Sequence, residues 1–259
     1  MKTLKSNIAS FMIATLFSIT NLNVVAQGLE TRVITGKISD GEHPIANVAV
    51  TDGQNIVTTD ENGCYSIKTS VNTRFVYITT PAGYVVPVKD KTIPQFYQHL
   101  ETDKNTYDFK LTKNQYNDNN HTFVVHSDVQ VTSTDDINQY KTIIDDCRNT
   151  INKTKGDVFG IDCGDIVGDS PQLYPNYIET VSALKIPFFR AIGNHDMDYY
   201  GRSHETSYKT FEKYFGPTVY SFNKGKAHYI ILNNNFFIGR DYFYMGYVDE
   251  KTFEWLEQD

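Results

Sequence analysis

Apolar runs of strand length alternate with helical repeats between residues 122 and 196, and this alternation restricts the chain to few folds. The runs are TFVVHSD, DVFGIDCGD and IPFFRAIGNHD, separated by DDINQYKTIIDDCRNTINK and YPNYIETVSALK. Thr134 or Asp135 is expected to cap the first helix, whose apolar face would collect Ile137, Tyr140, Ile143, Ile144, Cys147 and Ile151. Strand, helix, strand, helix, strand predicts a parallel α/β sheet with right-handed crossovers.

Each of these three runs ends in a cluster of polar residues. The clusters are 126–130, 164–169 and 193–196. The carboxyl ends of parallel strands meet at one edge of a sheet, where ligands bind, so we expect Asp128, Asp165, Asn194 and His195 to lie close together. A single Asp or Asn after a strand is also common in an ordinary turn. Three such clusters in consecutive units favour a site for a divalent metal, because oxygen and imidazole are its usual ligands.

Residues 28–113 have a different character. Short β-rich segments are separated by Gly, Asn, Asp and Pro, which predicts a small all-β sandwich domain. NIVTTDENGCYSIKT has two such arms around Asp60–Gly63 and predicts a hairpin. His43 and His99 are isolated, and no catalytic cluster is present in this part. The polar stretch 114–121 is expected to be a linker to a second domain, 122–259.

The N-terminus has the features of a secretory signal peptide. Lys2 and Lys5 precede the apolar stretch IASFMIATLFSI, and small residues surround Ala26. We therefore expect residues 1–26 to be removed, leaving no membrane span, and the protein to be periplasmic or secreted. Cleavage would change the net charge from −7 to −9. An acidic chain is a poor match for a phosphate backbone, so no nucleic-acid partner is expected.

The sequence has three cysteines, Cys64, Cys147 and Cys163, and no CxxC motif. We expect lone buried thiols, and neither a disulfide framework nor a zinc–thiolate site.

The clusters after the strands resemble the motifs of calcineurin-like metallophosphoesterases. Gly193-Asn194-His195-Asp196 matches the third motif of that family, and Gly164-Asp165 the core of the second. Residues 28–113, with TPAGYVVP and DENGCYSI, are similar to the β-sandwich that precedes the catalytic domain in a secreted bacterial subgroup. The resemblance implies an α/β fold of the metallophosphoesterase type, incomplete in this chain, and an enzyme that hydrolyses phosphorylated small molecules or esters.

The same resemblance implies a role for each matching residue. Two divalent ions, Mn, Fe or Zn, would be bridged by Asp165, with Asp128 on the first ion and Asn194 on the second. Gln130 stands where the family usually has a histidine ligand, and its amide oxygen can coordinate. His195 would contact the phosphate, and Asp196 would orient His195.

The chain departs from the family pattern at two further places. Gly168 replaces an expected Asp, and Asp169 follows one position later. No later Gly-His-x-His motif occurs. The remaining candidates, His126 and His228, are expected to be packed or half-exposed. TVYSFNKGKAHYIILNNN predicts a hairpin, and VDEKTFEWLEQD predicts a helix that lies mid-domain in the family.

These departures lead to two functional expectations. The first is a truncated phosphoesterase whose activity is impaired by the missing histidine ligands. The alternative is an inactive remnant, or an exported binding protein that works through its β-sandwich. The aromatic segment 196–220 is expected mainly to pack against the core, and the sequence leaves monoester, diester and oligomeric state open.

Overall fold

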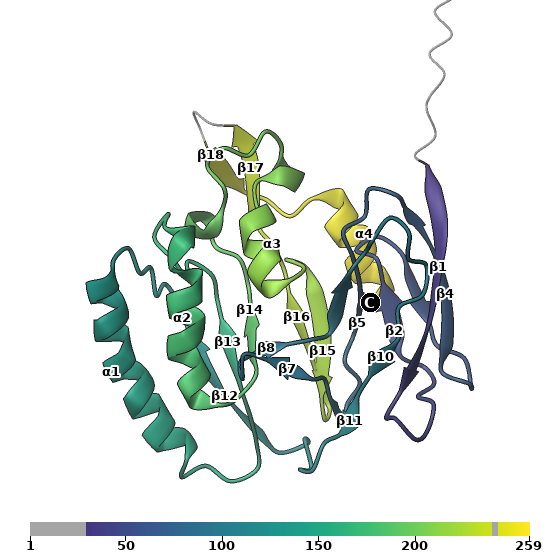
Figure 1. Cartoon of the computed structure of the whole chain (residues 1–259), viewed down its shortest axis with the longest axis horizontal. Coiled ribbons are helices and arrows are strands. Elements are labelled where there is room, and N and C mark those ends of the chain that lie inside the picture. The colour runs from purple at the N-terminus through teal and green to yellow at the C-terminus, as the bar shows by residue number, and fades with distance from the viewer. Residues whose placement is uncertain (1–29, 240–242) are drawn as a thin grey trace, which may run out of the picture.

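The computed structural model describes residues 30–239 and 243–259 (Figure 1). The predicted signal peptide, 1–26, lies outside the described residues. Among the described helices, none combines the length and the apolar character that crossing a bilayer requires.

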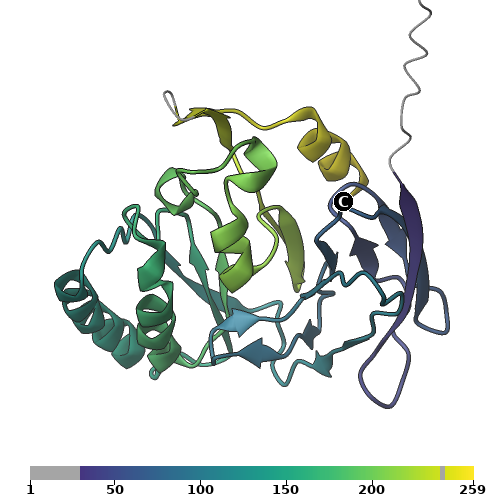
Figure 2. The same cartoon turned by 45° about the horizontal axis from the view of Figure 1, so that its top comes forward.

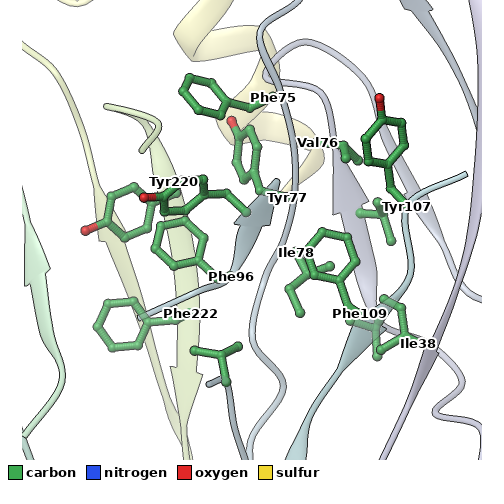
Figure 3. Packing of buried hydrophobic residues seen from close by; sticks show 14 of the residues in the cluster. Ile38, Phe75, Val76, Tyr77, Ile78, Phe96, Tyr107, Phe109, Tyr220 and Phe222 are labelled. Carbon is green, nitrogen blue, oxygen red and sulfur yellow. The ribbon is translucent and has the colours of Figure 1, made fainter. Parts of the chain in front are cut away.

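Two sheets form the N-terminal region. One has the order β10-β1-β4 and the other β3-β2-β5-β9. Their bounds are β1 (Thr31–Ser39), β2 (Ala49–Thr51), β3 (Ile56–Thr58), β4 (Cys64–Ser70), β5 (Phe75–Ile78), β9 (Tyr97–His99) and β10 (Phe109–Lys110). Side chains alternate between buried and exposed along β4 because neighbouring residues of a strand face opposite sides. Buried residues of both sheets, among them Ile38, Val50, Ile78 and Phe109, form one cluster (Figure 3).

The predicted hairpin around Asp60–Gly63 is wrong. Its two arms join different sheets, since β3 pairs with β2 whereas β4 pairs with β1. The Asp60 carboxylate accepts hydrogen bonds from the backbone N–H groups of Asn62 (2.9 Å) and Cys64 (2.8 Å), which fixes the turn. Gly63 has a φ of 72°, and a Cβ there would lie 2.4 Å from the carbonyl oxygen of Ile38. The turn therefore carries the chain from one sheet to the other.

Two short ladders connect this region to the rest of the molecule. They are β6 (Tyr84–Val85) with β11 (Thr112–Lys113), and β7 (Val88–Lys89) with β8 (Ile93–Pro94). Next to β8, the carbonyl of Thr92 accepts a 2.8 Å hydrogen bond from the N–H of Phe188. Thr80 forms an isolated parallel bridge with Phe222. These segments thus pack directly against the second half of the chain.

The predicted parallel sheet is confirmed, with the order β12-β13-β14. Its strands are β12 (His121–His126), β13 (Asp157–Asp162) and β14 (Phe188–Arg190). Helices α1 (Thr134–Ile151) and α2 (Tyr174–Val181) lie on one side of it (Figure 1). A 3-10 turn, Ser182–Leu184, extends α2.

The details of α1 differ from the prediction. Ser133 caps the helix rather than Thr134 or Asp135, because its hydroxyl accepts from the N–H of Asp136 while the Asp136 carboxylate accepts from the N–H of Ser133. Ile143 was assigned to the buried face, yet 55% of it is exposed. The expected burial of the cysteines is also wrong for Cys64 and Cys163, which are exposed and free.

The other side of the parallel sheet faces β15 (Tyr220–Lys224) and β16 (Ala227–Ile231), the hairpin that the sequence predicts. Phe189 of β14 stacks on Phe222 of β15 with ring centroids 3.7 Å apart. The remaining elements are α3 (Lys209–Phe215), β17 (Asn235–Gly239), β18 (Phe243–Gly246), α4 (Glu250–Gln258) and the 3-10 turns Pro171–Leu173, Asn194–Asp196 and His204–Thr206.

The two regions share a core. Phe159, Phe189 and Phe222 belong to the same buried cluster as the side chains of the N-terminal strands. Phe96 lies beside Tyr220, with ring centroids 4.4 Å apart (Figure 3). Helix α4 packs near β2 and β5 (Figures 1 and 2), where the Trp255 indole N–H donates to the Thr51 hydroxyl at 3.1 Å. Helix α4 therefore packs against the N-terminal region.

Candidate metal centre

The loops that follow β12, β13 and β14 lie at one edge of the sheet. The strand ends are in register, with His126 opposite Asp162 and Asp162 opposite Arg190. Asp128 and Gln130 follow the first strand, Asp165 the second, and Asn194 with His195 the third. The three polar clusters are thus brought to a common edge.

The backbone of these loops is strained. Asp128, Gln130, Asp165 and Asp169 have φ values of 51°, 44°, 51° and 56°. A left-handed conformation at a residue with a Cβ costs about 1 kcal/mol or more, and such residues concentrate at functional sites. The backbone N–H groups of Gln130 and Asp169 donate to the carbonyl oxygens of Asp165 (2.8 Å) and His195 (3.2 Å), which holds the loops in this conformation.

Asp165 connects all three loops. Its Oδ1 accepts a hydrogen bond from the N–H of His195 (2.9 Å), and its Oδ2 accepts from Nε2 of Gln130 (3.1 Å). Its carbonyl oxygen also accepts from the N–H of Gln130 at 2.8 Å. A Cβ at Gly193 would lie 2.0 Å from Asp165 Oδ1, so only glycine there leaves room for this carboxylate. Asp165 is buried at the centre of the site.

His195 meets a carboxylate that the sequence prediction did not assign to it. Its Nδ1 lies 3.0 Å from Oδ1 of Asp169, and the N–H of Asp169 donates to the His195 carbonyl at 3.2 Å. A carboxylate oxygen accepts a hydrogen bond, so this contact favours the tautomer that carries its proton on Nδ1. Asp169, one position later than the family motif, reaches the site because its φ is positive.

The expectation that Asp196 orients His195 is wrong. Asp196 is buried, and its carboxylate accepts from the N–H groups of Ile166 (3.0 Å), Val167 (3.2 Å) and Gly193 (2.9 Å). The Tyr174 hydroxyl donates to it at 3.1 Å. Burial raises the pKa of Asp196 to about 7, and the backbone N–H donors oppose that shift. Asp196 therefore fixes the loops after β13 and β14 to each other.

The residues with oxygen donors suit a hard divalent cation. Asp128 and Asp165 offer carboxylates, and Gln130 and Asn194 offer amide oxygens. The Gln130 amide now turns its NH₂ toward Asp165, and a half-turn would present its oxygen there instead. Within residues 30–239 and 243–259, no group of three or more His, Cys, Asp or Glu side chains could hold a metal. The amide oxygens are thus needed to complete a metal site from these residues.

A buried polar network lies beneath the site, and the sequence prediction missed it. Asp162, at the end of β13, contacts Arg190 Nε (3.2 Å), His126 Nδ1 (3.4 Å) and the Tyr177 hydroxyl. His126 also meets the Tyr140 hydroxyl at 2.8 Å, so its predicted packed role is confirmed. The sequence does carry a signal of this network, because a charged residue ends each of two apolar runs, Asp162 in GID and Arg190 in FFR.

The later histidines lie outside the strand-end loops. His228 is exposed and contacts Asn223 Oδ1 and Asp259 Oδ2, each at 2.8 Å, in line with the expected half-exposed role. His204 stacks on Phe236 and accepts a hydrogen bond from the N–H of Phe237.

A pocket of about 560 Å³ adjoins Asp169, the residue that contacts the His195 ring. Asp169 lines it, together with Tyr199, Tyr200, Arg202 and Lys209. The segment 196–220 was expected mainly to pack against the core, and Phe211 and Phe215 do so. Tyr200, in contrast, is 86% exposed. The aromatic segment thus serves both the core and the mouth of a pocket.

Comparison with known proteins agrees with this geometry. Neither a curated protein nor a solved structure matches the chain. The family model described as N terminal of Calcineurin-like phosphoesterase matches residues 32–114, and the model of the Calcineurin-like phosphoesterase domain matches residues 121–258. The second match covers more than half of the chain, and the motifs it contains lie in the three loops that meet at Asp165. The chain belongs to the calcineurin-like phosphoesterase family.

Proposed function

We propose that the chain hydrolyses esters of phosphate on small molecules at this edge of the sheet, with two divalent cations. Members of the family act on phosphoesters and generally use a dinuclear metal centre. The observation that carries the proposal is the place of Asp165, whose two carboxylate oxygens face two different loops. That arrangement suits a carboxylate shared by two ions.

The oxygen donors divide between two positions. Asp128 and Gln130 come from the first loop and would hold one ion, Asn194 comes from the third and would hold the other, and Asp165 lies between them. Bound divalent cations would neutralise charge on the phosphate and make hydroxide available near neutral pH.

In its doubly protonated form, His195 would supply the proton on Nε2 to the leaving oxygen and keep the proton on Nδ1. Asp169 holds Nδ1 and so sets the orientation of the ring. The leaving group would enter the pocket lined by Tyr199, Tyr200 and Arg202, which adjoins Asp169. A positioned acid of this kind contributes about 10²–10⁴-fold to a rate.

Export belongs to the same proposal. Residues 1–26 carry the features of a signal peptide, and a periplasmic or secreted enzyme would meet phosphate esters outside the cytoplasm. Mass spectrometry of the mature protein from the periplasmic fraction tests this point, since cleavage after Ala26 gives a defined N-terminal peptide.

The central experiment compares Asp165→Asn with Asp145→Asn, the same change at an exposed position of α1. Activity is measured with p-nitrophenyl phosphate and Mn²⁺, and metal content by elemental analysis. Asp165→Asn should abolish hydrolysis and lower the content of both ions, whereas Asp145→Asn should match the parent. Full activity in Asp165→Asn would contradict the proposal. A folded parent chain without metal or hydrolysis would favour the exported binding protein instead.

A further inference from the structure

A second cavity lies at the amino edge of the parallel sheet, away from the candidate metal centre. Its volume is about 720 Å³, which is the size of a small-molecule site. Its walls come from β6, β7 and β11 of the N-terminal region and from the end of α1, the start of β13 and the end of β15. Since the metal-centre loops follow the opposite ends of these strands, the two sites are separate.

The wall of the cavity is partly polar and partly apolar, and the apolar part comes from the core. Val86, Leu184, Ile186, Phe189 and Phe222 line it and belong to the two hydrophobic clusters of the molecule. These side chains are held by the packing around them, so the walls are formed before any ligand arrives. Burying an apolar chain or ring against these side chains is favourable in proportion to the apolar area removed from water.

The charges on the cavity wall are mainly positive. Its lining contains four cationic side chains, Lys113, Arg148, Lys185 and Lys224, and one acidic one, Asp157. Asp157 is already paired, because its Oδ2 accepts from Lys224 Nζ (2.7 Å) and from the Asn114 amide (2.9 Å). The whole chain, in contrast, has a net charge of −7. Arg148 and Lys113 are paired as well, with Asp145 (2.8 Å) and Asp40 (3.8 Å), so the excess positive charge at the cavity is carried by Lys185.

Lys224 is the best-placed of these groups to meet a ligand. Only 5% of its side chain is exposed, and Nζ donates to Asp157 while lying 5.6 Å from the centre of the Phe159 ring. An ammonium group has three donors, and Asp157 accepts one of them. Two of its three donors can therefore still donate to an acceptor oxygen.

We propose that this cavity binds an amphipathic anion, a hydrocarbon chain or ring that carries one carboxylate. The carboxylate faces the lysines, Lys185 and Lys224, and the hydrocarbon lies against Leu184, Ile186 and Phe189. A cation of the same length would be repelled by the lining, and a neutral alcohol would gain no attraction from it. This binding is independent of the metal centre and of the hydrolysis proposed above.

The test uses isothermal titration of the full chain with dodecanoate below its micelle concentration, in the presence of EDTA. Dodecyltrimethylammonium and dodecanol serve as matched cationic and neutral probes. Dodecanoate should bind in a 1:1 ratio, at least tenfold more tightly than either probe, and more weakly as salt is raised. Equal affinity for the three probes, or no binding of dodecanoate, would overturn the proposal.

Two variants locate the site. Lys185→Glu reverses an exposed charge at the cavity and should weaken dodecanoate about tenfold, whereas Lys141→Glu makes the same change on an exposed part of α1 and should have no effect. Val88→Trp, at a partly exposed wall position, should block binding by filling the space. Unfolding curves without ligand confirm that each variant is folded. Equal binding by Lys185→Glu and Lys141→Glu, or full binding by Val88→Trp, would place dodecanoate elsewhere and reject the cavity.

Discussion

At the scale of single residues, two carboxylates near His195 perform different tasks. Asp169 contacts the ring, and Asp196 holds the backbone of two loops. Asp169→Asn keeps an acceptor near Nδ1 but removes its charge, and we expect kcat to fall about 10–100-fold with metal content unchanged, the usual scale for loss of such an outer partner. Asp196→Asn turns an NH₂ group toward backbone N–H donors and should instead lower the free energy of unfolding by about 1–3 kcal/mol. Steady-state kinetics and urea unfolding separate the two. Normal kcat in Asp169→Asn would remove this residue from the mechanism.

Gly193 makes room for the Asp165 carboxylate. Its added Cβ would lie 2.0 Å from Asp165 Oδ1, so Gly193→Ala must displace the group proposed to bridge the ions. We expect a loss of hydrolysis of more than about 10²-fold, because small shifts of positioned groups are costly, and a lower metal content by elemental analysis. Gly246→Ala is the control, since its Cβ would meet no atom within 4 Å. Two active variants with full metal content would show that Asp165 need not occupy this position.

At the scale of elements, the ends of β12, β13 and β14 are joined by the buried Asp162 network. Arg190→Gln would leave Asp162 without its cationic partner in the interior, and we expect a loss of about 3–5 kcal/mol in the free energy of unfolding. The exposed pair of Arg148 and Asp145 provides the comparison, and Arg148→Gln should cost about 1 kcal/mol or less. Chemical denaturation measures both. Similar small effects would mean that the network adds little to the stability of the strand ends.

The same elements show what sequence could and could not predict. The parallel sheet was predictable, because the spacing of apolar residues that indicates strands and helices is a local property of the sequence. The meeting of Asp165 with His195 was predictable as well, because the carboxyl ends of parallel strands lie at one edge of a sheet. The partner of His195 was not predictable, because Asp169 reaches the ring through a left-handed turn that the residue types in this loop do not indicate. The turn at Asp60 has the residues of a hairpin, and only the pairing of β3 and β4 with different neighbours shows its role. Contacts between separate elements determine both of the features that were not predictable, the partner of His195 and the pairing of β3 and β4.

At the scale of the whole molecule, side-chain contacts join the N-terminal region to the phosphoesterase domain. Arg74, next to β5, donates through Nε (2.6 Å) and Nη2 (2.8 Å) to the buried Glu212 of α3. Arg74→Ala should lower the free energy of unfolding by about 2–3 kcal/mol, less than for a fully buried pair because 36% of the Arg74 side chain is exposed.

Thermal unfolding with Lys104→Ala as control measures this effect, since Lys104 and Glu101 form an exposed pair at 3.7 Å. We expect a single transition for the parent and for both variants. Two separate transitions, with only the first affected by Arg74→Ala, would instead show that the N-terminal region unfolds on its own.

The contact between Trp255 and Thr51 has a consequence for the order of events in biosynthesis. The two residues are 204 positions apart in the chain, and Trp255 is completely buried against the N-terminal strands. A contact of such long sequence separation forms late, because the entropy of closing the intervening loop is lost before the contact is gained. The first strands emerge from the ribosome long before Trp255 is made. The N-terminal strands would therefore lack this packing partner until residue 255 has been added to the nascent chain.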